Sequence, residues 1–109
     1  MERIDPNQAV DYVLKNAKKF AKAKAERVYL EEFRKSKKAL LMQASTESTS
    51  VAQERDAYAH AEYRQLLEGL KQAVEIEEQL RWTLIAAQAR IEIWRSQEAS
   101  NRMMDKASQ

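Results

Sequence analysis

The chain has 109 residues, enough for one domain, and glycine and proline each occur once among mostly helix-forming side chains. So few turn residues exclude a β-rich fold, and the lack of cysteine excludes disulfides and thiolate metal sites. A net charge of +2 is too small to argue for nucleic-acid binding by itself, but residues 1–42 carry 11 Lys/Arg against 6 Asp/Glu, whereas residues 43–109 carry 8 against 11.

The first predicted element is a long helix over residues 5–43. Asp5 is a good N-cap, Pro6 suits the first helical position, and Gln8 stands where a capping-box partner belongs. Apolar residues in this stretch follow helical spacing only loosely. The phase of the pattern slips near Lys24, where we expect a bend or a change of register.

A Ser/Thr-rich loop is predicted over residues 44–50, because Ser and Thr hydroxyls compete for backbone hydrogen bonds and favour turns. Ser50 and Gln53 predict a capping box at the start of a short helix over residues 51–59. A second long helix is predicted over residues 61–103. Gly69 lies inside it at a cost of about 1 kcal/mol relative to Ala, which we attribute to close approach by a neighbouring helix.

The strongest pattern in the chain is a 3-4-3-4 spacing of apolar residues in the second long helix, which we call the first seam. Its positions are Tyr63, Leu66, Leu70, Ala73, Glu77, Leu80, Leu84, Ala87, Ile91 and Trp94. Such a seam has to bury itself against another helix. Glu77 is its one polar member, and if it is buried it requires a cation, for which a Lys or Arg of the first helix is the obvious source.

A second apolar stripe, formed by Trp82, Ile85, Ala89 and Ile93, lies on another face of the same helix. One stripe can meet the first helix, and the other then needs a second protomer. We therefore predict an all-α fold: a single domain over residues 1–109, built as an elongated antiparallel helical hairpin with coiled-coil-like packing that self-associates. The expected core or oligomer-interface residues are Leu66, Leu70, Leu80, Trp82, Leu84, Ile91, Ile93 and Trp94.

Cations cluster in the first helix, and Lys15 to Lys22 include four that fall within an arc of about 100°. Cations along a rod can neutralise successive phosphates without reading bases. The candidate nucleic-acid-binding residues are Lys15, Lys18, Lys19, Lys22, Lys24, Arg27, Arg34, Lys35 and Lys38. A solvated outer face and a surface for an acidic protein are the alternative interpretations. Tyr12 and Tyr29, which lie among these cations, either stack on unpaired bases or join the core.

No residue pattern in the chain indicates catalysis, a cofactor or a bound metal. Glu75, Glu77 and Glu78 form an acidic run without a His or Asp within a turn, and pairing with a cation such as Arg81 explains it better. His60 is the one histidine and cannot anchor zinc alone, so we expect it in a loop or a cap. We therefore expect a protein that is not an enzyme, has no small-molecule substrate and, lacking a membrane-spanning run, is cytoplasmic.

Three stretches of the chain carry a resemblance to a known group of proteins. They are residues 27–39, then Glu54-Arg55-Asp56-Ala57-Tyr58 with Glu62-Tyr63 and Leu66-Leu67, and finally Leu80-Arg81-Trp82, Ala86-Ala87 and residues 90–95. Together they resemble a family of small helical phage and prophage proteins, often encoded near recombination and single-strand-binding genes, over roughly residues 22–102. The resemblance brings no catalytic residues and implies an accessory role in DNA recombination or replication.

These observations predict a phage accessory factor that binds the backbone of single-stranded DNA or a recombination protein. Two alternatives remain. One is an adaptor that acts only through protein–protein contacts, and the other is an inhibitor of a host nuclease or defence complex.

Overall fold

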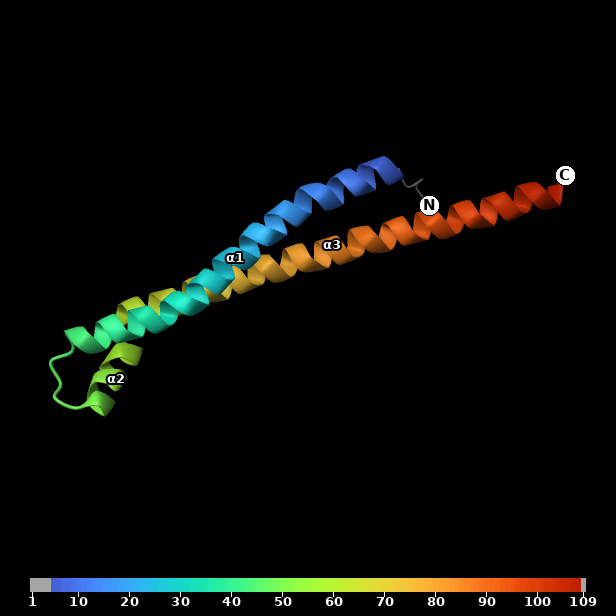
Figure 1. The fold of residues 1–109 in the computed structure, drawn as a ribbon. Coiled ribbons are helices and arrows are strands. Elements are labelled where there is room, and N and C mark those ends of the chain that lie inside the picture. The colour runs from blue at the N-terminus through green and yellow to red at the C-terminus, as the bar shows by residue number, and fades with distance from the viewer. Residues whose placement is uncertain (1–4, 109) are drawn as a thin grey trace. The chain divides into compact units, whose positions relative to one another are not determined.

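The computed structural model describes residues 5–108, which form three helices: α1 (Pro6–Ala44), α2 (Ser50–Ala59) and α3 (Ala61–Ser108) (Figure 1). No strand occurs in this part of the chain, and the prediction of an all-α helical hairpin is confirmed. The α3 helix continues past residue 103, where we had placed its end. Residues 1–4 and 109 of the predicted 1–109 domain lie outside the described residues.

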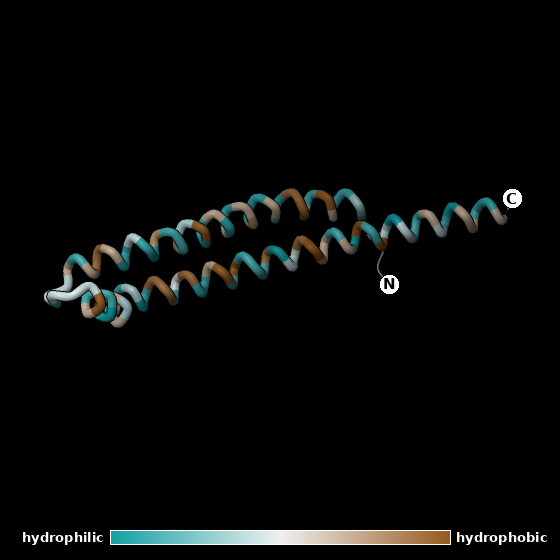
Figure 2. Tube along the Cα trace, turned by 60° about the horizontal axis from the view of Figure 1, so that its bottom comes forward, coloured by the Kyte–Doolittle hydropathy of each residue, from teal (hydrophilic) through white to brown (hydrophobic). Residues whose placement is uncertain are grey.

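The described chain divides into two compact units. Residues 21–78, the hairpin unit, contain the second half of α1, all of α2 and the first part of α3. Residues 5–20 and 79–108, the terminal unit, contain the two outer ends of α1 and α3. Along both long helices apolar residues alternate with polar ones at helical intervals (Figure 2), so each unit buries a stripe rather than a thick core.

In the hairpin unit α1 and α3 run antiparallel, because Arg27 bonds Glu77 while Lys37, farther along α1, bonds the earlier Glu62. The α3 side of the contact is the first seam, whose members from Tyr63 to Glu77 are all buried or half-buried. The α1 side has the same 3-4 spacing, at Ala23, Arg27, Leu30, Arg34, Lys37 and Leu41. The two stripes therefore face each other as in a coiled coil.

The closed end of the hairpin unit holds its most complete core. Leu41, Ala57 and Tyr63 form a buried cluster with Met42 packed against it, and Ala57, at 1% exposure, is the most deeply buried of the core residues. The Tyr63 ring also meets the Tyr58 ring edge-on at 5.3 Å between centroids. Each of the three helices thus contributes a side chain to this cluster, which holds the short α2 against the long pair.

The helix ends are fixed by side-chain caps. Asp5 caps α1 as predicted, because its Oδ1 accepts hydrogen bonds from the backbone N–H groups of Asn7 and Gln8 at 2.9 and 3.4 Å. The predicted capping box at residue 50 is wrong: the N-cap of α2 is Thr49, whose hydroxyl accepts from the Ala52 N–H at 3.2 Å.

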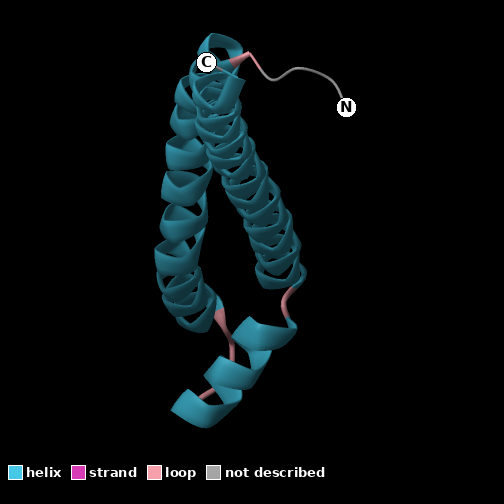
Figure 3. Cartoon of the chain, turned by 90° about the vertical axis from the view of Figure 1, so that its right-hand side faces the viewer, coloured by secondary structure: helices cyan, strands magenta, loops and turns pink. Residues whose placement is uncertain are grey.

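His60, which we expected in a loop or a cap, occupies a cap. It is the C-cap of α2, with its backbone N–H bonded to the Ala57 carbonyl, and its Nδ1 accepts from the Glu62 N–H at 3.0 Å in the first turn of α3. One residue therefore ends α2 and starts α3, which accounts for the single break between them (Figure 3).

Two expectations about backbone packing are corrected by the structure. A Cβ built on Gly69 would meet nothing within 4 Å, so the predicted close approach of a neighbouring helix at this residue is wrong. The slip in phase near Lys24 is also absent, because the burial of α1 continues in 3-4 steps from Phe20 to Ala23 and Arg27. The sequence suggested a slip because Arg27 occupies a position where we looked for an apolar residue.

The terminal unit is more thinly packed. On α3 the first seam continues through Leu80, Leu84, Ala87, Ile91 and Trp94, all buried or half-buried, and on α1 the covered positions are Ala9, Val13, Asn16 and Phe20. Asn16 is 7% exposed, and its amide donates to the Tyr12 carbonyl one turn earlier at 2.9 Å, so the buried polar group is satisfied within its own helix. All described residues beyond Glu98 are exposed.

Candidate nucleic-acid interface

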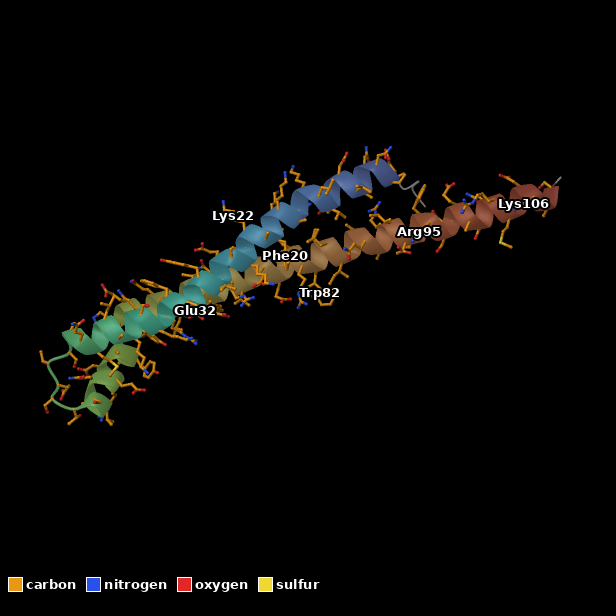
Figure 4. The ribbon with its side chains drawn as sticks, in the orientation of Figure 1. Phe20, Lys22, Glu32, Trp82, Arg95 and Lys106 are labelled. Atoms are coloured by element: carbon orange, nitrogen blue, oxygen red, sulfur yellow. The ribbon has the colours of Figure 1, made fainter. Side chains whose placement is uncertain are left out.

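The predicted interface consists of cations on α1, a helix with ten Lys/Arg against four Asp/Glu. Five exposed lysines lie between residues 15 and 24: Lys15, Lys18 and Lys19 in the terminal unit, and Lys22 and Lys24 in the hairpin unit. None of the five has an ion-pair or hydrogen-bond partner among the described residues. Lys22 projects outward from α1 (Figure 4). These five lysines are called the free lysines below.

Arg27 belongs to a different environment, because it lies in the stripe of α1 that packs on α3. Its Nε and Nη2 donate to the two carboxylate oxygens of Glu77 at 2.5 and 3.0 Å, and its Nη1 donates to Glu31 at 3.1 Å. Hydrogen bonding to Glu77 raises the pKa of Arg27, an effect that partial burial opposes. The expectation that a buried Glu77 takes a cation from the first helix is confirmed.

Lys38 is also held by neighbouring groups in the hairpin unit. Its Nζ lies 3.3 Å from a Glu54 carboxylate oxygen and 4.8 Å from the centroid of the Tyr58 ring. A hydrogen bond with the Tyr58 hydroxyl is the main cause that raises the pKa of Lys38, and Glu54 adds a smaller effect in the same direction. Partial burial opposes both effects. A lysine in this position ties α1 to α2 and has less freedom to follow a phosphate backbone.

Some of the other cations in the second half of α1 lie on the surface, and others lie in the α1 stripe that packs on α3. Lys35 forms an exposed pair with Glu32 at 3.4 Å, a contact that contributes little because solvent screens it. Lys37 reaches Glu62 on α3 at 2.9 Å, and this bond lowers the pKa of Glu62. Arg34 is half-buried in the α1 stripe. The structure therefore does not gather the nine predicted residues into one uniform strip.

Two of the four aromatic residues near these cations, Tyr12 and Tyr29, are on the surface. Tyr12 is 48% exposed and Tyr29 is 61% exposed, and the Tyr29 ring stacks on Phe33 with 5.9 Å between centroids. An exposed, pre-stacked ring offers a face on which an unpaired base could lie. Phe20 and Phe33 are half-buried instead.

The residues predicted as core or oligomer interface separate into two groups. Six of them, on the first seam, are half-buried: Leu66, Leu70, Leu80, Leu84, Ile91 and Trp94. The other two, Trp82 and Ile93, are 61% and 46% exposed. Trp82 projects from α3 on the side away from α1, with the Arg81 guanidinium 6.0 Å from its ring (Figure 4). Residues 5–108 therefore leave the second stripe uncovered.

Other kinds of site find little support in the described chain. No group of three acidic or histidine side chains in residues 5–108 could hold a metal ion. Within the same range, none of the helices combines the length and apolar character that crossing a membrane requires.

The sequence interpretation missed Lys37 and Asn16 as members of the α1 stripe. The sequence did contain a signal for them, which is the 3-4 spacing of residues from Ala9 to Leu41. This spacing can be recognised only if polar residues with long apolar stems are counted as possible members of a seam.

Comparison with known proteins gave no further guide to function: no protein-family model, no curated protein and no solved structure matches this chain.

Proposed function

We propose that this protein is a non-enzymatic helical factor that contacts the phosphate backbone of single-stranded nucleic acid through the free lysines of α1. The observation that carries the proposal is the contrast within one helix. Lys15, Lys18, Lys19, Lys22 and Lys24 are exposed and unpaired among the described residues, whereas Arg27 and Lys38 are committed to carboxylates of the same chain.

Contacts of this kind would give affinity without sequence preference. Lysine ammonium groups are mobile point charges that neutralise phosphates and release counterions, and nothing in this reads base edges. The exposed Tyr12 ring on the same helix supplies a surface for stacking. The resemblance of residues 22–102 to phage proteins suggests recombination or replication as the setting, with single-stranded DNA as the ligand.

The proposal is tested by fluorescence anisotropy of a labelled single-stranded oligonucleotide over a series of salt concentrations. Each phosphate contact is expected to add about −0.7 to the slope of log K against log salt, so four lysines contribute about −3. Replacing Lys15, Lys18, Lys19 and Lys22 with Ala should remove most of that slope and leave the helical content unchanged.

The matched control removes the same number of exposed cations elsewhere, by replacing Arg55, Arg64, Lys71 and Arg90 with Ala. If both variants lose the same affinity and slope, net charge alone drives binding and the proposed interface is wrong. No binding of the unaltered chain at low salt would also refute the proposal and would favour an adaptor that contacts only proteins.

A further inference from the structure

The exposed side of α3 in the terminal unit contains a second seam with regular heptad spacing. Its positions follow one another in strict 4-3 steps: Trp82, Ala86, Ala89, Ile93, Ser96, Ser100, Met103 and Ala107. All eight are exposed, and Trp82, Ile93 and Met103 reach 61%, 46% and 73%. Residues 81–108 include eight charged side chains, and none of them occupies a second-seam position.

This spacing is that of a helix whose apolar edge faces another helix along its length. The first seam has the same spacing and is covered by α1, whereas the second seam lies on the opposite face of α3, where none of the described residues covers it. We infer that the second seam binds the second seam of another copy of this chain, antiparallel, with Trp82 of each copy opposite Ala107 of the other.

The sizes of the side chains select this arrangement. Pairing Trp82 with Ala107 also sets Met103 against Ala86 and Ile93 against Ser96, so that every large residue meets a small one. A parallel dimer would set Trp82 against Trp82 and Ala86 against Ala86, which crowds some layers and leaves gaps in others. A shift of one heptad in the antiparallel pair would set Ile93 against Met103 and leave only small residues in the layers beside them.

The charges that flank the second seam are compatible with the same pairing. In the antiparallel arrangement Arg90 faces Gln97, Glu92 faces Ala99, and Lys106 faces Ile85, so no like charges oppose each other. Lys106 also comes next to the Trp82 ring of the other copy, where a cation is attracted to the aromatic face.

The contact area indicates a reversible dimer. Residues 82–107 extend about 38 Å along the helix, and at a helix width of about 10 Å the strip presents roughly 400 Å² on each copy. A standard stable interface buries about 800 Å² on each partner. The dimer should therefore dissociate on dilution, and the dimerisation constant must be measured over a wide range of protein concentration.

Sedimentation velocity over such a range tests the pairing. The unaltered chain should shift from monomer to dimer as concentration rises. Ile93→Glu should weaken the dimer by at least about tenfold, because it buries a charge in the seam. Ile76→Glu is the matched control: Ile76 is 52% exposed on α3 but lies outside the second seam, so this variant should dimerise like the unaltered chain.

The direction and register are tested by disulfide formation, since the chain has no cysteine of its own. In the inferred dimer residue 89 faces residue 100, so a mixture of Ala89→Cys and Ser100→Cys chains should cross-link on oxidation, while Ser100→Cys alone should not. Cross-linking of Ser100→Cys with itself would indicate a parallel dimer and overturn the inference. So would a chain that stays monomeric at every concentration, which would leave the face for a different protein. Neither result depends on whether the free lysines bind nucleic acid.

Discussion

Leu41 and Leu40 provide the sharpest test of how the hairpin unit is packed, because neighbouring residues of the same type lie in opposite environments. Leu41 is 8% exposed and belongs to the cluster with Ala57 and Tyr63, whereas Leu40 is 57% exposed. The same substitution, Leu to Ala, therefore removes core packing at one position and only surface contact at the other.

The expected losses follow from these environments. Leu to Ala in a core costs about 2–5 kcal/mol, and the lower half of that range applies to Leu41 because Met42 lies beside the site and can partly fill the space. Leu40→Ala should change the free energy of unfolding by less than about 0.5 kcal/mol. Against a total of about 5–15 kcal/mol for a chain of this size, only the first change is large.

Urea unfolding followed by far-UV circular dichroism measures both values, and it should be repeated at several protein concentrations so that any dimer does not distort the comparison. Equal losses in the two variants would refute the assigned packing of the closed end. A large loss for Leu40→Ala alone would mean that α1 faces α2 and α3 with its other side.

Two further predictions concern single residues of α3. Gly69→Ala should raise the free energy of unfolding, measured in urea, by about 0.5–1 kcal/mol, since a Cβ there meets nothing within 4 Å. The control, Ala25→Gly on the exposed side of α1, should lower it by a similar amount. Destabilisation by Gly69→Ala would mean that another group does pack against this residue. The bond to Lys37 lowers the pKa of Glu62 in the folded chain. The stabilisation of the fold by this ion pair is therefore fully present above the ordinary glutamate pKa of about 4.3, and it is lost as the pH falls through the lower folded-state pKa. Glu62→Gln should therefore lessen the acid-induced loss of stability in a pH series of thermal melts, whereas Glu68→Gln should not, and identical curves for the two would contradict this role of Glu62.

The sequence was sufficient to predict the helical hairpin and the α3 side of its contact, because nine of the ten positions of the first seam are apolar and stand at regular intervals. The α1 side was harder to recognise. Its stripe contains Asn16, Arg27, Arg34 and Lys37, whose apolar stems or local hydrogen bonds allow them to be covered. A hydrophobic pattern alone reads such positions as solvent-exposed.

The candidate interface could be predicted only in part. Lysines on one face of a helix can be recognised from spacing, but whether a cation is free depends on which carboxylate the opposite helix brings to it. Arg27 and Lys38 illustrate this, because Glu77 and Glu54 lie 50 and 16 positions farther along the chain, and only the folded alignment sets each against its partner. Local caps were similarly ambiguous, since Thr49 and Ser50 are both suitable residues and one position separates them.

The paired bonds between Arg27 and Glu77 also act as a ruler for the hairpin unit. The planar guanidinium group of Arg27 can form both hydrogen bonds to a carboxylate in one alignment only. Sliding α3 along α1 by one heptad, about 10.5 Å, could place Leu70 beside this guanidinium in place of Glu77. Apolar seams alone do not fix the register of two helices, because one leucine can replace another at the contact. Extra residues inserted between α1 and α2 should consequently lengthen the loop there and leave the register of α1 against α3 unaltered.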